Sequence, residues 1–357
     1  MTRVMQITPA YPPDISGVGD YAALLSRSFG ASGHDLDTVV PGSAERTGKR
    51  VVAVDREAEP LARTLAEADN VLLHFSGYGY ARRGLCHWLV DGLARWKAGG
   101  KDRRLVTMFH EVYATGPIWR SSFWTAGPQR RIARDLARLS DAGFVSSLGG
   151  YEQLHSLCPE LPLEVSEVFS NIGELETPLP FSQRRPEGIV FGGAARRRQV
   201  YQALHRSGDH ARAALHAQGV RRLLDIGPPM TPAPSIEGLE VEICGPLPAT
   251  DVSALLAERR IGLIHYKRST ITKSGIAAAY FSHGLLVVNT GEYDAYSVDM
   301  QEGVHLLDLN RLLEASLDAE AVSQAGWARY QPHRLDVTST RLARALGMSS
   351  ARNTSDA

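Results

Sequence analysis

Residues 7–21, ITPAYPPDISGVGDY, join a short apolar strand to a helix through a proline-rich loop and a Gly17-Val18-Gly19 turn. Glycines at a helix start let backbone N–H groups approach an anion or sugar, and the helix dipole favours negative charge there. The pattern lacks the third glycine of a dinucleotide-binding fingerprint, and no acidic residue ends the next strand as a ribose ligand. It therefore favours an anion or sugar site over an NAD site, and a simple glycine turn is the alternative.

The same alternation of strand and helix continues along the chain. Short β-branched runs predict strands at 4–7, 51–54, 71–75, 105–109 and 143–146, and helical periodicity lies between them at 21–29, 61–68, 85–96 and 130–139. After a polar, proline-containing lapse at 170–185, further strands are predicted at 189–191, 222–226, 241–244, 261–265, 285–289 and 304–307. Strands that alternate with helices indicate parallel sheets, so the chain is predicted to be an α/β protein with two Rossmann-like domains facing across a cleft.

The polar, proline-containing segment 170–185 and the chain length determine the expected domain bounds. With 357 residues the chain is long enough for two cores. We expect a first domain at 1–172, a linker at 173–185, a second domain at 186–336, a helix at 337–348 that packs back toward the first domain, and a disordered tail at 349–357.

The composition limits the partners and the compartment. Lys plus Arg and Asp plus Glu both number 39, so no overall field favours nucleic acid. Three separated cysteines without zinc-type spacing, and the absence of a signal peptide or an apolar span, predict a cytoplasmic protein with reduced thiols. The Arg-rich stretch 129–138 is either a solvated helix face or a weak peripheral membrane contact. The oligomeric state stays open.

Two basic clusters in the second half suit a phosphate. Arg196, Arg197 and Arg198 follow a glycine turn, and a guanidinium fork matches a diphosphate. Lys273-Ser274-Gly275 at a predicted helix start offers an ammonium, a hydroxyl and free N–H groups. The alternatives are a solvated arginine run, and an N-cap serine beside a solvated lysine.

Several of these motifs together resemble family 4 of the retaining glycosyltransferases, which have the GT-B fold. The resemblance rests on Pro-x-Tyr-Pro-Pro followed by Ser-Gly-Val-Gly-Asp-Tyr, on a helix closing at Gly33-His34 before another strand, on Phe109-His110-Glu111 at a strand end, and on the strand and turn at Ile243-Cys244-Gly245-Pro246. It implies that Gly17 and Gly19 face the donor diphosphate and acceptor, that His110 faces the donor sugar, and that the base lies near Gly245.

The chain departs from that family at one position pair. The two glutamates that the family carries, with seven residues between them, would fall near Ile271 and Ala279, where no carboxylate stands. This puts ribose binding in doubt, and Glu292, just after the strand at 285–289, is a weak substitute. The diphosphate contacts would then fall to Arg197, Arg198, Lys273, Ser274 and Gly275.

The resemblance implies hexosyl transfer from a nucleoside diphosphate sugar to an acceptor hydroxyl of a small molecule or glycan, with retention, no metal and no cofactor. Cationic side chains would do the work of a metal at the leaving phosphate. The Asp35-Leu36-Asp37 string, expected between the first helix and second strand, matches a metal motif of another glycosyltransferase architecture but lies away from the expected cleft. The alternatives are a pseudo-glycosyltransferase or epimerase of the same fold, and a catalytically reduced scaffold that binds a nucleotide or glycan.

Overall fold

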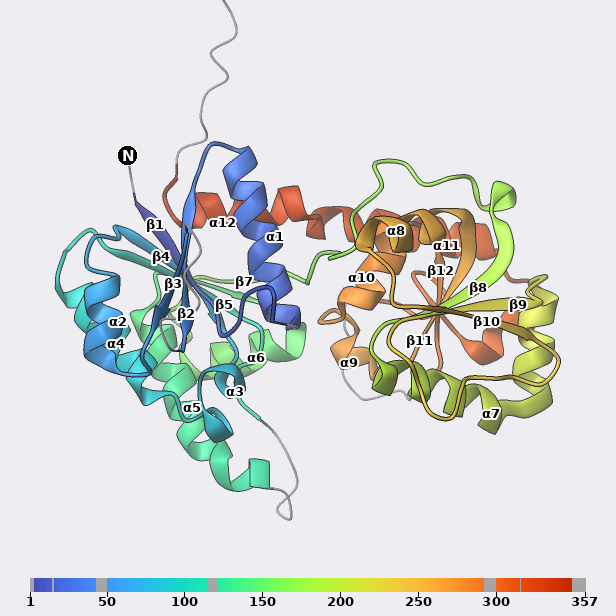
Figure 1. The fold of residues 1–357 in the computed structure, drawn as a ribbon, viewed down its shortest axis with the longest axis horizontal. Helices are drawn as coiled ribbons and strands as arrows, with labels where there is room; N and C mark the ends of the chain where they lie inside the picture. The colour runs from blue at the N-terminus through green and yellow to red at the C-terminus, as the bar shows by residue number, and fades with distance from the viewer. Residues whose placement is uncertain are drawn as a thin grey trace, which may run out of the picture. The chain divides into compact units, whose positions relative to one another are not determined.

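The computed structural model describes residues 3–14, 16–42, 50–114, 121–291, 300–314 and 316–348. The chain divides into two compact units, of which unit 1 contains residues 1–167 and 335–357, and unit 2 contains residues 168–334. Each unit is an α/β sandwich built on a parallel sheet (Figure 1). The predicted α/β class, with two Rossmann-like units in which strands alternate with helices, is therefore confirmed.

Unit 1 has, within the described residues, a seven-stranded parallel sheet in the order β3-β2-β1-β4-β5-β6-β7. Its strands are β1 (Val4–Ile7), β2 (Leu36–Pro41), β3 (Val51–Val54), β4 (Asn70–Phe75), β5 (Arg104–Phe109), β6 (Ala142–Val145) and β7 (Leu163–Val165). Its helices are α1 (Gly17–Ala31), α2 (Ala58–Thr64), α3 (Gly77–Tyr80), α4 (His87–Ala98), α5 (Ser121–Leu139), α6 (Leu148–Leu157) and α12 (Leu335–Ala345). The sequence patterns gave no bounds for β2, and they missed β7, which has only three residues and no buried one.

Unit 2 repeats the topology with a six-stranded sheet in its described part, in the order β10-β9-β8-β11-β12-β13. The strands are β8 (Arg185–Phe191), β9 (Arg222–Ile226), β10 (Glu240–Gly245), β11 (Arg259–Ile264), β12 (Leu286–Asn289) and β13 (Leu307–Asp308). The helices are α7 (Ala194–Ala217), α8 (Ala249–Glu258), α9 (Arg268–Ile271), α10 (Gly275–Ser282) and α11 (Ala319–Tyr330). The strand expected at 304–307 is observed only at Leu307–Asp308.

The central strands β1 and β4 of unit 1 are buried along their whole length. All six residues of β4 are buried, because helices cover both sides of a parallel sheet. The unit 1 core joins residues of β4 and β5 to the inner faces of α4 and α5. In unit 2, two clusters of buried side chains lie against the sheet, one around α10 and one around α7. Each unit therefore has a core of its own.

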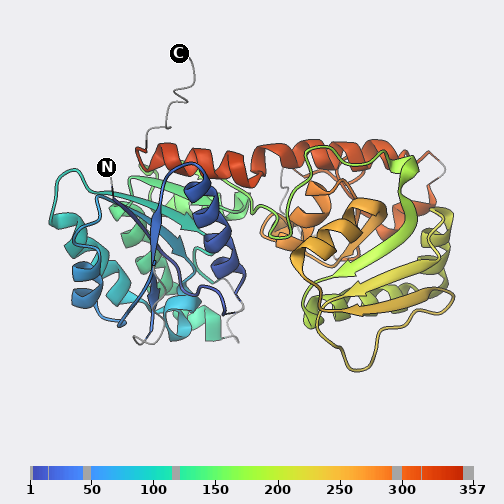
Figure 2. The same ribbon diagram turned by 45° about the horizontal axis from the view of Figure 1, so that its top comes forward.

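The C-terminal helix α12 belongs to unit 1. Leu342 and Leu346 are buried at 1% and 0% exposure, and the Asn70 amide donates to the Leu346 carbonyl at 2.6 Å. The hydroxyls of Ser28 in α1 and Ser339 in α12 are 3.0 Å apart, and Figure 2 shows the two helices packed together. Residues far apart in the chain thus complete one core.

The segment 173–185, expected as a linker, lies within unit 2 and is anchored there. The Tyr330 hydroxyl donates to Glu174 at 2.5 Å and accepts from the Ser170 N–H at 2.7 Å. The Leu175 N–H donates to the Ser282 carbonyl at 3.3 Å. These bonds tie the segment to α10 and α11.

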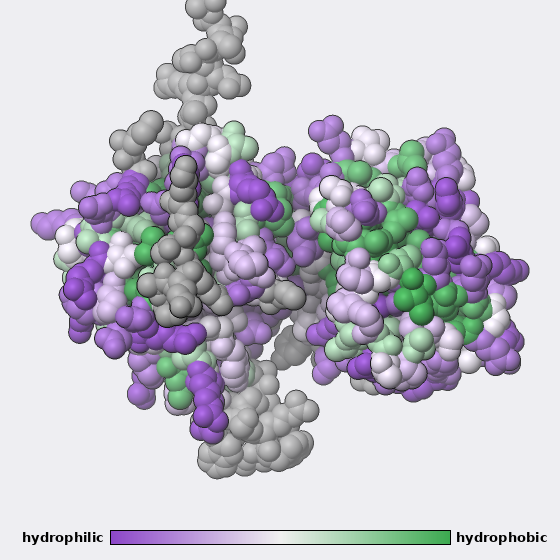
Figure 3. All heavy atoms as spheres, in the orientation of Figure 1, coloured by the Kyte–Doolittle hydropathy of each residue, from purple (hydrophilic) through white to green (hydrophobic). Residues whose placement is uncertain are grey.

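The described surface is a mixture of hydrophilic residues and smaller hydrophobic patches (Figure 3). Among the described residues, no helix is both long and apolar enough to cross a bilayer. The apolar residues of the Arg-rich stretch 129–138, Ile132, Ala133, Leu136 and Ala137, are at most 1% exposed in the unit 1 core. These apolar side chains are therefore part of the unit 1 core and are not exposed for insertion into a bilayer.

Candidate functional site

The strand order identifies the candidate ligand-binding edge of each sheet. In both sheets the chain adds strands on one side of the first strand and then crosses to its other side, between β1 and β4 in unit 1 and between β8 and β11 in unit 2. Open α/β sheets bind ligands beyond the carboxyl ends of the strands at this switch point. The residues that follow β1, β4, β8 and β11 are therefore the candidates.

In unit 2 the turn between β8 and α7 is built from two glycines with different requirements. Gly192 has a φ of +124°, and a Cβ there would come within 2.4 Å of Ile276 in α10. Gly193, the N-cap of α7, would meet nothing within 4 Å. The protein's own packing explains the first glycine, whereas the open space at the second leaves the α7 N-terminus accessible to an anion.

The three arginines after this turn separate because a helix rotates about 100° per residue. The Arg197 side chain is 1% exposed: its Nε donates to the Gly192 carbonyl at 2.8 Å, and its other nitrogens contact Asp225 and the Pro228 carbonyl. It braces the loops after β8 and β9, so the structure corrects its expected place among the diphosphate ligands. Arg198 is exposed on the α7 surface.

Arg196 faces the switch point, which the sequence did not indicate. Its guanidinium carbon lies 4.7 Å from the ring centroid of Tyr266, which follows β11. Buried Asn289 at the end of β12 holds this loop: its Oδ1 accepts from the N–H groups of Tyr266 and Gly291 at 3.0 and 3.1 Å, and its Nδ2 donates to the Tyr266 carbonyl at 2.9 Å. A stacked cation and aromatic ring are thus fixed between β8 and β11.

Lys273, Ser274 and Gly275 form the start of α10, as predicted. Lys273 is exposed, whereas Ser274 is 5% exposed and its Oγ accepts from the Ala277 N–H at 3.1 Å. Ser274 is therefore the N-cap of α10. A Cβ at Gly275 would lie 3.3 Å from Oδ1 of exposed Asn171, which places an amide side chain beside this helix start.

Gly245, expected near the donor base, ends the edge strand β10. It has a φ of +71°, a Cβ there would meet nothing within 4 Å, and its carbonyl accepts from the Gly227 N–H at 2.9 Å. In the strand order, β9 lies between β8 and the edge strand that Gly245 ends. Gly245 is thus at the carboxyl end of the sheet, away from the β8–β11 switch point.

The acidic residues that the structure describes beyond β12 are not the ones that the sequence predicted for ribose binding. Glu292 lies outside the described residues, and the Ala279 side chain is buried in α10. Glu302, 15% exposed, lies 3.9 Å from Arg268 and 3.2 Å from Arg311. Burial raises the pKa of nearby Asp308 to about 6, although Arg268 and Arg311 act in the opposite direction.

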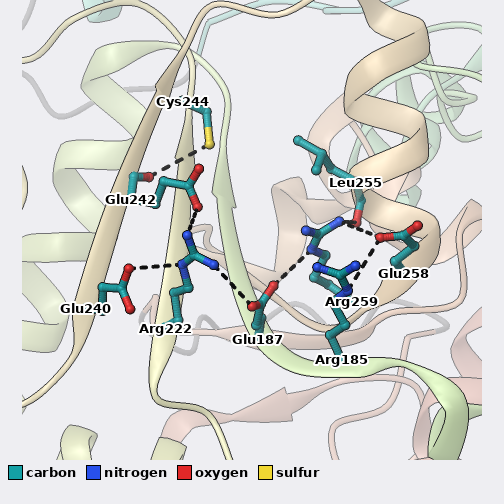
Figure 4. A network of polar contacts seen from close by, with 9 residues as sticks. All are labelled: Arg185, Glu187, Arg222, Glu240, Glu242, Cys244, Leu255, Glu258 and Arg259. Atoms are coloured by element: carbon teal, nitrogen blue, oxygen red, sulfur yellow. Dashed lines mark hydrogen bonds and ion pairs between the residues drawn. The ribbon is translucent and has the colours of Figure 1, made fainter.

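A second charged network lies away from this edge, at the amino ends of the strands (Figure 4). Arg222 in β9 pairs with Glu240 and Glu242 in β10 at 3.2 and 2.5 Å, and Glu187 in β8 contacts Arg259 in β11 at 3.1 Å. Charges along the edge strand β10 oppose pairing with another chain. We assign this network to the stability and solubility of the sheet.

Both aspartates of the Asp35-Leu36-Asp37 string form ion pairs with arginines. Leu36 and Asp37 belong to β2, so the string begins that strand instead of preceding it. Asp35 pairs with Arg50, and Asp37 lies 3.4 Å from Arg3. No group of three or more His, Cys, Asp or Glu side chains with the geometry of a metal site occurs in the described part of the chain.

In unit 1 the predicted glycine turn begins α1. The Ser16 Oγ accepts from the Gly19 N–H at 3.3 Å, which caps the helix. A Cβ at Gly19 would approach the Ala10 carbonyl oxygen to 2.8 Å, whereas one at Gly17 would meet nothing within 4 Å. Gly19 is required by the passage of the loop over the helix, and Gly17 leaves room for a ligand.

His110 follows β5 and is 8% exposed. Its Nε2 lies 3.4 Å from Nδ1 of His74 in β4, and His74 Nε2 lies 3.2 Å from Oε1 of Gln6 in β1. Burial, with a further contribution from His110, holds the pKa of His74 well below its usual range. The sequence predicted His110 but not the buried side chains behind it, since they lie on strands that only the sheet brings together.

Comparisons with solved structures show which architecture these two units form. An α-glucosyltransferase in complex with UDP aligns over 97% of this chain and 99% of its own, with a TM-score of 0.59 and 10% identity. The α,α-trehalose 6-phosphate synthase from Burkholderia multivorans aligns over 97% and 96%, at 0.58 and 11%. The chain has the GT-B fold. A UDP complex of S. aureus MnaA aligns over all of both chains, at 0.55 and 12%.

Sequence comparisons add no family to this fold. No family model matches the chain, and no curated protein matches it. At 10–12% identity the likeness concerns the fold alone. The GT-B architecture is thus established over nearly the whole length, and the activity must be argued from the side chains.

Proposed function

We propose that this protein is a glycosyltransferase that moves a hexosyl group from a nucleoside diphosphate sugar to an acceptor hydroxyl, with retention and without a metal ion. The observation that carries the proposal is the start of α10 in unit 2, where Lys273 precedes a capped helix N-terminus on a GT-B scaffold. A helix N-terminus beside an ammonium group is a favourable place for a diphosphate. The proteins similar in fold include complexes with UDP.

In this proposal unit 2 stabilises the leaving group. Negative charge grows on the nucleoside diphosphate as the glycosidic bond breaks, and fixed donors lower the energy of that state. Lys273, Arg198 and the N–H groups at the α10 start supply positive charge. Arg197 acts indirectly, because it fixes the turn that positions Gly193 and α7. The donor base is proposed near Gly245.

Unit 1 supplies the acceptor side in the same proposal. Gly17 leaves open space at the α1 start, and His110 follows β5 at the sheet edge where ligands bind. We assign His110 to the donor sugar, as the family resemblance implies. The acceptor is a small molecule or a glycan, since the balanced net charge gives no support for nucleic acid.

An epimerase is the second candidate. A Listeria monocytogenes protein described as a putative UDP-N-acetylglucosamine 2-epimerase aligns over 97% of this chain with a TM-score of 0.54. The missing glutamates at Ile271 and Ala279 also separate this chain from the family it resembles. An epimerase would convert the sugar of a donor into its epimer, whereas a transferase would deliver it to an acceptor.

The test starts with thermal unfolding in the presence of a panel of nucleoside diphosphates. A ligand at one hundred times its Kd adds about 2.7 kcal/mol of stability. Sugars carrying the stabilising nucleotide are then incubated with the protein and candidate acceptors. Release of nucleoside diphosphate that depends on an acceptor supports transfer, an epimeric donor supports the second candidate, and binding without either product supports a scaffold.

A further inference from the structure

The polar side chains behind His110 form a chain of contacts that crosses three adjacent strands of unit 1. Thr38 in β2, Gln6 in β1 and His74 in β4 follow one another along the sheet, and His74 reaches His110 after β5. Gln6, Thr38 and His74 are at most 1% exposed. Water therefore does not compete for these contacts, and each hydrogen must have a definite place.

The Gln6 amide has one orientation that satisfies its neighbours. One of its terminal atoms lies 3.4 Å from the Ala22 carbonyl and 2.8 Å from the Thr38 hydroxyl. A carbonyl oxygen can only accept, so the NH2 group must lie on this side. The amide oxygen Oε1 then faces His74 Nε2 at 3.2 Å.

The orientation of Gln6 sets the tautomer of His74. Because Oε1 can only accept, His74 must donate from Nε2. His74 is buried and its pKa lies well below the usual range, so the ring is neutral and carries a single hydrogen. Its Nδ1 is therefore an acceptor, and it points at His110 Nε2 at 3.4 Å.

We infer that Gln6 and His74 are positioning residues that place the hydrogen of neutral His110 on Nε2 and leave its Nδ1 as a hydrogen-bond acceptor. Tyr21 also constrains both ring planes, because it contacts His110 edge-on at 4.9 Å and His74 edge-on at 5.6 Å between centroids. This geometry determines which proton chemistry His110 can perform. A neutral His110 accepts at Nδ1 and does not donate there.

The consequence for transfer rests on the proposed function. If His110 contacts the donor sugar, its Nδ1 would accept a hydrogen bond from a sugar or acceptor hydroxyl. The contacts through Gln6 and His74 would hold His110 in the tautomer that this hydrogen bond requires. The tautomer itself does not depend on that function. The tautomer of His110 can therefore be tested independently of the proposed transfer activity.

The test is NMR of the full chain labelled with ¹⁵N in histidine, in which long-range couplings distinguish the two neutral tautomers. His110→Gln identifies the His110 signals by their loss. At pH 8 we expect both His74 and His110 to carry hydrogen on Nε2 and to have an unprotonated Nδ1. A wild-type His110 with its hydrogen on Nδ1 would overturn the inference, and this result needs no variant to fold.

The variant Gln6→Met removes the acceptor for His74 while keeping the side-chain length. We expect the His110 signals to move toward a mixture of tautomers, and kcat for transfer to fall about tenfold with the donor KM changed less than about twofold. Gln129→Met is the matched control, since Gln129 is also buried in unit 1 but bonds Ala114 and Arg83. It should leave the His110 tautomer unchanged. If the His110 tautomer is unchanged in a folded Gln6→Met protein, the inference that Gln6 and His74 set this tautomer is wrong.

Discussion

At the residue scale, two neighbours at the start of α10 have different physical roles. Lys273 is exposed, so its side chain is accessible to a ligand. Ser274 is buried and accepts from the Ala277 N–H, so it stabilises the helix directly. Substitutions at the two positions should therefore separate binding from stability.

We predict that Lys273→Ala weakens nucleoside diphosphate binding by about ten- to a hundredfold, because a charge-assisted hydrogen bond contributes roughly 1.5–3 kcal/mol. The free energy of unfolding should change by less than about 0.5 kcal/mol. Calorimetric titration of the preferred nucleotide measures the first effect, with exposed Lys101→Ala as the control. Equal dissociation constants for wild type and Lys273→Ala would reject the assignment.

Ser274→Ala gives the complementary result. Loss of the N-cap hydrogen bond should lower the free energy of unfolding by about 1 kcal/mol. Nucleotide affinity of the folded protein should change less than it does in Lys273→Ala. Chemical denaturation together with the same titration compares the two, and a large affinity loss without a stability loss would make Ser274 a ligand instead of a cap.

Asp308 provides a test by pH. Its pKa is raised to about 6 in the folded protein, so the folded state binds the proton more tightly than the unfolded state, whose pKa is near 3.8. Stability from this group is present at low pH and is lost as the pH rises through about 6. Asp308→Asn should therefore stabilise the protein at pH 8, by about 1 kcal/mol after allowance for solvent screening, and have little effect at pH 4. Denaturation at the two pH values measures this difference, and an equal effect at both would contradict it.

At the scale of elements, α7 shows how one helix divides consecutive arginines between structure and surface. Arg197 joins the helix to the loops after β8 and β9 through Gly192, Asp225 and Pro228. Its neighbours Arg196 and Arg198 are exposed. The buried Arg197–Asp225 pair organises the loops at the carboxyl edge of the sheet.

Arg197→Met should cost about 3–5 kcal/mol of stability, because it leaves the Asp225 carboxylate buried without its partner. Arg198→Met is the matched control, and it should change stability by less than about 0.5 kcal/mol. In the proposed function, Arg198→Met should instead weaken nucleoside diphosphate binding by several-fold. Urea denaturation and calorimetry test both, and a stable Arg197→Met protein with a selective loss of affinity would restore Arg197 as a ligand.

At the scale of the whole molecule, two units of the same topology each present the carboxyl edge of a parallel sheet. Unit 2 gathers cationic groups and helix N-termini near its switch point, and unit 1 gathers histidines and a glycine turn near its own. In the proposed function, unit 2 would stabilise the leaving phosphate and unit 1 would bind the sugar hydroxyls.

We predict that transfer survives removal of divalent ions, since Lys273, Arg198 and the α10 start would neutralise the leaving diphosphate. Activity in excess EDTA should remain within about twofold of the untreated enzyme, a change below about 0.5 kcal/mol in the barrier. Addition of Mn²⁺ or Mg²⁺ after EDTA is the control. Complete loss with EDTA and recovery with either ion would show that a metal neutralises the phosphate.

The amino-acid sequence by itself determined the fold class, because strand and helix periodicity are local properties that each segment carries in its own residues. It also indicated the starts of α1 and α10, where glycine, serine and lysine stand next to one another in the chain. It failed at Arg197, since three adjacent arginines look alike until a helix turns one of them toward Asp225. Only the tertiary structure could place Arg196 on Tyr266, or align Gln6, His74 and His110, because these contacts join strands that are distant in the chain and adjacent only in the sheet.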